Sequence, residues 1–185
     1  MKKLLFLISA LFVSAGPAIA GDPIFGGDQN QISLTWGRST GGGPLSQLII
    51  PNWRFEGFEY FELSYGQPSE FFRLPARLNV HAGYLADHRD RPVREKSHLL
   101  AGISWDAVLL RYCGFYFGMG IGAFIKEFAD EQQDSQFNFG EKAFIGYRFD
   151  GGYNAEFSTR HFSNGDLTPG NGSYNFAGIT FAVSF

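Results

Sequence analysis

The C-terminal residues alternate strictly between apolar side chains and small or polar ones. Ala177, Ile179, Phe181, Val183 and Phe185 would share one face of a strand, and the residues between them the other. A period of two is typical of a β-strand with one apolar face, because successive side chains point to opposite sides. This end of the chain therefore predicts a sheet that buries or embeds one face.

The same alternation recurs along the chain. Further stretches begin at Ile32, Ala76, Leu99, Phe115, Ala143 and Asn154, and residues 50–65 are predicted to form one long strand. That makes eight strands, with Arg, Lys, Glu and Asn on the face opposite the apolar one. A bilayer offers no hydrogen-bond partner to a free strand edge, so such a sheet must close on itself. We predict an all-β fold, an eight-stranded antiparallel transmembrane β-barrel filled by side chains. A secreted soluble β-sandwich is the less favoured fold.

The linkers alternate in length, as they do in transmembrane barrels with long outer loops and short periplasmic turns. The long ones are predicted at 39–47, 87–96, 126–135 and 164–174, and the shorter ones at 66–72, 106–110 and 150–152. Both termini would then be periplasmic, and Ser163 would lie at the external end of its strand. A C-terminal aromatic after alternating apolar residues resembles the recognition signal of outer-membrane barrels.

Residues 1–20 are predicted to be a cleaved signal peptide, because Lys2 and Lys3 precede an apolar run that ends in small residues. Residues 21–185 would form a single domain, exported to the bacterial outer membrane. Acidic residues outnumber Lys and Arg by 18 to 15. That excess argues against nucleic acid as a partner. The lone Cys113 allows no internal disulfide.

His161 and Ser163 stand out because both should point toward lipid, where polar side chains are costly. Residues i and i+2 of a strand lie roughly 6.5 Å apart on one face. That spacing lets an imidazole reach a serine hydroxyl, the core of an activated nucleophile. The alternative is that both residues contact lipid headgroups and carry no chemistry.

The sequence Arg160-His161-Phe162-Ser163-Asn164-Gly165, followed by a Pro/Gly/Asn loop and a terminal strand ending in Phe185, resembles the lipid A 3-O-deacylase family (PagL type). The specific match covers about the last 25 residues. The resemblance implies an eight-stranded outer-membrane barrel that hydrolyses the ester-linked acyl chain at the 3-position of lipid A. It also implies Ser163 as nucleophile, His161 as general base and Asn164 as a candidate for the oxyanion site, through its side chain or backbone N–H.

The family's third catalytic member is an acid at the start of the last strand, and this sequence lacks it. Counting from Ser163 gives Asn175, whose parity places it on the lipid face, whereas Tyr174 would point inward. Neighbouring strands should put Asn175 beside His161. Asp166 in the loop is the alternative orienting residue, and Glu156 faces inward. A dyad without an orienting group also stays open.

The sequence thus predicts a carboxylic ester hydrolase acting on lipid A, or lipopolysaccharide, in the outer leaflet of the outer membrane. Neither metal nor organic cofactor is implied. A non-enzymatic eight-stranded barrel, serving as scaffold or adhesin, is the alternative. The sequence leaves open whether the barrel forms a homodimer.

Overall fold

The computed structural model describes residues 29–41, 53–88, 97–130, 132–170 and 172–185. The predicted signal peptide at 1–20 lies outside them. The strands are β1 (Gln31–Ser39), β2 (Phe58–Phe71), β3 (Leu74–Asp87), β4 (Ser97–Tyr112), β5 (Phe115–Lys126), β6 (Phe137–Arg148), β7 (Tyr153–Ser163) and β8 (Tyr174–Ser184). Among the described residues, no helix has the length and hydropathy to span a bilayer.

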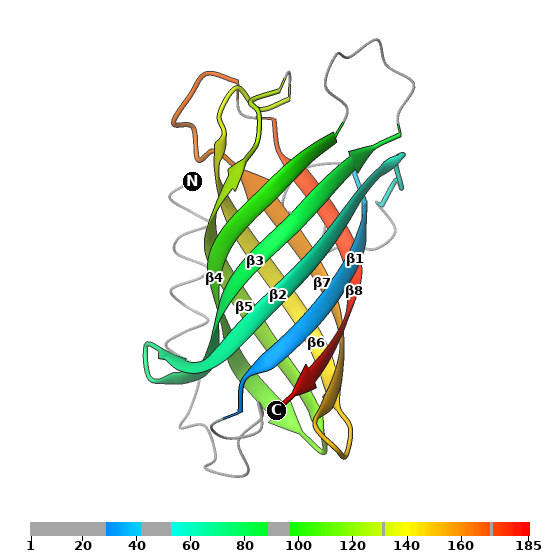
Figure 1. The fold of residues 1–185 in the computed structure, drawn as a ribbon, viewed down its shortest axis with the longest axis vertical. Coiled ribbons are helices and arrows are strands. Elements are labelled where there is room, and N and C mark those ends of the chain that lie inside the picture. Colours follow the sequence, from blue (N-terminus) through cyan, green and yellow to red (C-terminus); the bar gives the residue numbers. More distant parts are fainter. Residues whose placement is uncertain (1–28, 42–52, 89–96, 131, 171) are drawn as a thin grey trace.

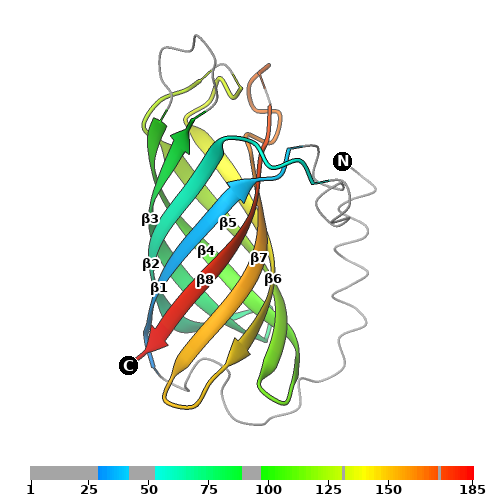
Figure 2. The same ribbon diagram turned by 90° about the vertical axis from the view of Figure 1, so that its right-hand side faces the viewer.

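The strands form a closed antiparallel barrel in which each pairs with its neighbours in sequence and β1 also pairs with β8. Figures 1 and 2 show the tilted strands, with tight turns at the end that holds the C-terminus. Closure gives both edges of every strand a partner, which a lipid environment requires. The predicted eight-stranded barrel is confirmed.

Charged side chains inside the barrel form a paired network across its middle. Lys142 Nζ lies 3.0 Å from Asp106 Oδ2 and 3.0 Å from Glu156 Oε2. Arg77 lies 2.7 Å from the other Glu156 oxygen, and Arg160 lies 3.2 Å from Glu62. All six side chains are buried. Buried charges persist because each has an opposite charge or hydrogen-bond partner.

An aromatic cluster fills the barrel on the side of this network that faces the long loops. Two leucines, Leu85 and Leu100, pack among its aromatic members, which are Phe58, Tyr60, Phe124, Phe162, Tyr174 and Phe176. The Arg160 guanidinium lies over the Phe124 ring at 5.4 Å and the Phe162 ring at 5.7 Å. Gly140 makes room for this packing, because a Cβ there would approach Phe124 to 2.4 Å. The interior is a packed core rather than a channel.

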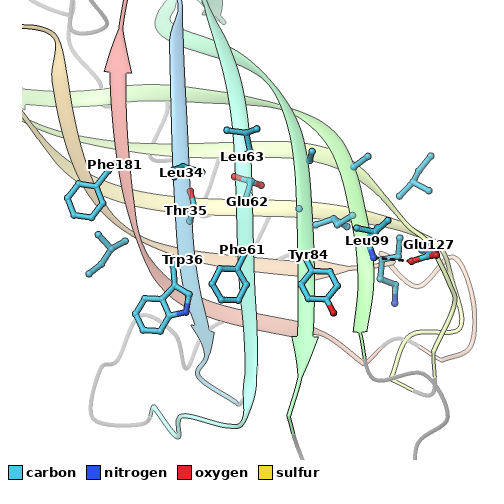
Figure 3. A pocket seen from close by; sticks show the side chains of 17 residues that line it. Leu34, Thr35, Trp36, Phe61, Glu62, Leu63, Tyr84, Leu99, Glu127 and Phe181 are labelled. Carbon is cyan, nitrogen blue, oxygen red and sulfur yellow. Dashed lines mark hydrogen bonds between the residues drawn. The ribbon is translucent and has the colours of Figure 1, made fainter.

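The outer wall is apolar. Leu34, Leu63 and Phe181 are each more than half exposed, and Figure 3 shows Leu34, Trp36, Phe61, Leu63, Tyr84 and Phe181 around a shallow hollow on this wall. Such exposure would be a liability in water, but it suits contact with acyl chains.

Two predicted turns are wrong, and one predicted strand starts too early. Residues 66–70 belong to β2 and 106–110 to β4, so the tight turns lie at Phe72-Arg73 and Cys113-Gly114. All four turn residues have positive φ, as a two-residue hairpin needs, although Asn-Gly is its usual signature. β2 begins at Phe58 rather than at residue 50. The predicted turn at 150–152 is confirmed, with Gly151 and Gly152 at positive φ.

The barrel's orientation in the membrane generates a prediction. The exposed Cys113 lies in a tight turn and should face the periplasm. A maleimide on a polymer too large for porins should leave it unlabelled on intact cells and label it after permeabilisation. In a Cys113→Ser background, Asp166→Cys should be labelled on intact cells. The reverse pattern would invert the topology.

Candidate active site

The direction of the β7 side chains is set by what fills the barrel. Arg160 and Phe162 point inward, where Arg160 pairs with Glu62 and Phe162 joins the aromatic cluster. His161 and Ser163, which alternate with them, therefore point outward and are half-buried. A register shift of one residue would move the Arg160 guanidinium and the Phe162 ring out of the barrel interior to the lipid face. The register of β7 is therefore strongly specified.

His161 is held by a neighbour on the adjacent strand. Asn175 of β8 pairs with it in register, and His161 Nδ1 lies 2.6 Å from Asn175 Oδ1. The amide Nδ2 of Asn175 donates to Ser173 Oγ at 3.4 Å, which turns its carbonyl oxygen toward the imidazole. Nδ1 must then carry the proton, which leaves Nε2 as the basic nitrogen. The predicted proximity of Asn175 to His161 is confirmed.

Ser163 ends β7, two residues beyond His161 on the same face. No hydrogen bond joins its hydroxyl to the imidazole among the described residues; in enzymes without bound substrate this contact is often long. The turn after it depends on Gly165, which has φ of 65°. A Cβ there would meet the Phe139 ring at 2.8 Å. The backbone therefore leaves the strand abruptly at the serine.

Asn164 points away from the lipid face and holds this turn together. Its Nδ2 donates to Thr168 Oγ1 at 2.6 Å and to the Gly170 carbonyl at 3.0 Å. Its Oδ1 accepts from the Asp166 N–H at 2.9 Å. The side chain is fully buried. Because its amide is committed to the loop, the side chain is poorly placed to serve an oxyanion, which leaves the backbone N–H as the candidate.

The loop between β5 and β6 braces the segment that carries Ser163. Gln133 Nε2 donates to the Phe162 carbonyl at 3.0 Å, and Gln132 Nε2 donates to the Ser173 carbonyl at 2.7 Å. The bracing loop is itself fixed by Asp130, whose Oδ1 accepts both backbone N–H groups of Gln132 and Gln133. Sequence reasoning missed this contact because no local pattern links two loops so far apart in the chain.

Two aspartates of the bracing loop stay ionised to low pH. Burial raises the pKa of Asp130, but hydrogen bonds from His98, Lys126 and Tyr174 outweigh it and hold that pKa below its ordinary value. Hydrogen bonds from the Thr168 hydroxyl and the Gly170 N–H lower the pKa of Asp134. Each carboxylate therefore holds its partners across the neutral and mildly acidic range.

Glu141 is a further site residue that sequence reasoning missed. It lies on β6, directly opposite His161 in the register, with its side chain on the same face as the imidazole. Its side chain is exposed on the outer face. The alternation of side chains along β6 could have revealed it. Glu141 shares a face with Ala143 and Ile145 and is the one carboxylate among the lipid-facing residues of β6.

Other features of the described residues do not add to this site. No group of three or more His, Cys, Asp or Glu among them could hold a metal ion. The apolar hollow of Figure 3 lies on β8 and β1–β5, and neither His161 nor Ser163 lines it. Asp166 is exposed in the turn with φ of 62°, and the hydrogen bond at His161 Nδ1 goes to Asn175 instead.

The chain has the features of an outer-membrane β-barrel protein: a closed barrel, an apolar outer wall, and long loops at one end with tight turns at the other. Solved structures agree. A crystal structure of the outer-membrane enzyme PagL has a TM-score of 0.53 at 13% identity, covering 83% of this chain and 98% of that one. The N-terminal barrel domain of Pseudomonas aeruginosa OprF has a TM-score of 0.58 at 13% identity, covering 85% and 98%. Neisserial surface protein A has a TM-score of 0.54 at 10% identity, covering 85% and 96%.

The model of the lipid A 3-O-deacylase (PagL) family matches residues 59–184. The chain belongs to that family, and its class is that of a lipid A deacylase of the outer membrane. None of the curated proteins matches the sequence.

The hydrogen bonds that Asp134 accepts from the 164–170 turn should depend on pH. Asp134→Asn should loosen the 164–170 turn, because the Thr168 and Gly170 donors lose their carboxylate, and should lower activity a few-fold. In the unaltered protein, the hydrogen bonds from Thr168 and Gly170 to Asp134 should persist at every pH above 3.8, the ordinary pKa of this carboxyl group. They should weaken only as the pH falls further, because the pKa of Asp134 is lower in the folded protein. Limited proteolysis and hydrogen exchange at Gly170 measure this. Asp150→Asn in the opposite turn is the control and should change neither.

Proposed function

We propose that the protein hydrolyses the ester bond at the 3-position of lipid A, with Ser163 as nucleophile and His161 as general base. The observation that carries this proposal is the pairing of His161 Nδ1 with Asn175 on the membrane-facing wall, with Ser163 on the same face. A histidine whose tautomer is fixed, beside a serine, supports nucleophilic chemistry better than contact with headgroups does.

The reaction proceeds in two steps. His161 Nε2 takes the proton of the Ser163 hydroxyl as Oγ attacks the ester carbonyl, and the tetrahedral intermediate then collapses to an acyl-serine. The imidazolium returns its proton to the departing sugar oxygen. Water, activated by the same nitrogen, hydrolyses the acyl-serine and releases a free fatty acid.

The negative charge on the tetrahedral oxygen needs a donor. The backbone N–H of Asn164 directly follows the nucleophile, the position from which a main-chain donor serves the oxyanion in other serine hydrolases. The Asn164 side chain supports this role indirectly, because its bonds to Thr168 and Gly170 keep the turn rigid.

The location of the site matches a substrate that lies in the membrane plane. His161 and Ser163 sit at the end of β7 nearest the long loops, which is the outer-leaflet side. There the ester of lipid A lies between the apolar interior and the headgroup layer. The 3-position is proposed from the family to which the chain belongs.

Substitution of the reacting pair tests the chemistry. Ser163→Ala and His161→Ala should each abolish release of the 3-linked chain, and the double variant should be no worse than either single one. Mass spectrometry of lipid A from cells expressing each variant measures the product. Ser158→Ala, an inward serine of the same strand, is the control and should retain activity. Activity in Ser163→Ala would rule out the nucleophile.

Substitution of the orienting amide tests the tautomer. Asn175→Ala should lower kcat, by as much as about 10⁴-fold, the loss that follows when an orienting group in a serine protease favours the wrong tautomer. Asn175→Glu should give an activity equal to or higher than that of the unaltered protein, provided that the carboxylate is hydrated and ionised. Asp166→Ala should have little effect. A large loss from Asp166→Ala with none from Asn175→Ala would move the orienting role into the loop.

A further inference from the structure

The third member of the site raises a question of charge. Asn175 can fix the imidazole's tautomer, but an amide carries no charge to stabilise the imidazolium that forms when Ser163 loses its proton. A carboxylate normally supplies that charge. At the position on β8 where the family's acid is expected, this chain has an amide.

Glu141 supplies a carboxylate from the opposite side. The register places Glu141 of β6, His161 of β7 and Asn175 of β8 in one row across three strands. Directly opposed residues of antiparallel strands have Cβ atoms about 4.5–5.5 Å apart. From such a neighbouring position a Glu side chain can bring its carboxylate to within about 4–6 Å of the ring, a range at which it favours the protonated imidazole. All three residues lie on the outer face, so no strand separates the charges.

The surrounding charges leave this pair isolated. The sequence neighbours Lys142 and Arg160 point inward and are paired with Asp106, Glu156 and Glu62. On the outer faces of β6, β7 and β8, Glu141 and His161 are the charged or titratable residues of the site end, and the tyrosines of that face, Tyr147 and Tyr153, lie at the other end. Among the described residues, the segments that pack against this end of the site also carry Arg38 of β1, which lies in the row of Ala177, Asp134, which binds the 164–170 turn, and Asp166 in that turn.

A carboxylate on a lipid-facing wall also needs an explanation of its own. Charged side chains on the outer face destabilise a barrel when they lie deep in the bilayer and cost little near the interface. Glu141 lies level with His161, near the loop end, and below it the same face continues with Ala143 and Ile145. A carboxylate here is tolerable at the headgroup layer and lies where the reaction develops positive charge.

We propose that Glu141 is the displaced acid of the site: a positioning residue that stabilises the His161 imidazolium from β6, while Asn175 fixes the tautomer from β8. This inference rests on the proposed function. The catalytic set is then Ser163 and His161, assisted by an amide and a carboxylate on two different strands.

The test compares Glu141→Gln with Glu59→Gln. Glu59 is the matched control, since it is an outer-face carboxylate of β2 that lies 4.0 Å from His88. Purified barrels in mixed micelles with lipid A are assayed for fatty-acid release across pH. Glu141→Gln should lower kcat about 10- to 100-fold with little change in KM, and should move the acidic limb of kcat/KM about one unit to lower pH, because the imidazolium loses its partner charge. Glu59→Gln should change neither.

Moving the charge gives the decisive variant. Glu141→Gln combined with Asn175→Glu puts one carboxylate back beside His161 from β8, and should recover both kcat and the position of the acidic limb. An unchanged profile in Glu141→Gln, a loss of kcat without the shift, or an equal loss in Glu59→Gln would overturn the proposal.

A second readout separates this proposal from the proposed function. The ¹³C-imidazole titration of His161 in Ser163→Ala, assigned with His161→Gln, should move to lower pH when Glu141→Gln is added. That shift needs no activity, so it tests Glu141 even if no lipid A is deacylated. An unmoved titration would overturn the proposal, whereas failure of Ser163→Ala to abolish turnover would overturn the proposed function alone.

Discussion

The need to pair every backbone N–H and C=O within the membrane governs this structure. The eight strands meet it by closing, with β1 bonded to β8. Closure fixes one inside and one outside for the whole sheet, so the side chain at each position has its environment decided by parity. The site follows from this rule. Arg160 and Phe162 are anchored inside, and His161 and Ser163 are thereby held outside, where a lipid substrate lies.

The barrel's filling also bears on the chemistry. Paired charges across the middle and an aromatic cluster beneath the loops make the wall rigid. On that wall Glu141, His161 and Asn175, which form one row across three strands, can keep their distances from one another without bound substrate. The loops complete the site in a different way. Gln132 and Gln133 bind the segments on either side of the turn that follows Ser163, and Asp134 binds the turn itself. Rigid positioning of this kind is what preorganised catalysis requires.

Parity made much of this predictable from the sequence. Alternation predicted the closed barrel and its eight strands, and it also placed Asn175 on the face of His161. The turns at Phe72-Arg73 and Cys113-Gly114 were missed because hairpin closure imposed positive φ on Phe72, Arg73 and Cys113, residue types that rarely adopt it. Glu141 was missed because its partner depends on the register between β6 and β7, which turn geometry sets. The burial of the Asn164 amide needed the loop's path, which no period encodes.

The central claim is that Ser163 is an activated nucleophile on the membrane-facing wall. A long-chain alkyl fluorophosphonate presented in micelles tests it most directly, since such reagents phosphonylate a serine whose proton a base removes. Intact mass and peptide mapping of the folded barrel should show one adduct, on Ser163, and none in His161→Ala. An unmodified barrel, or an adduct on another residue, would contradict the account.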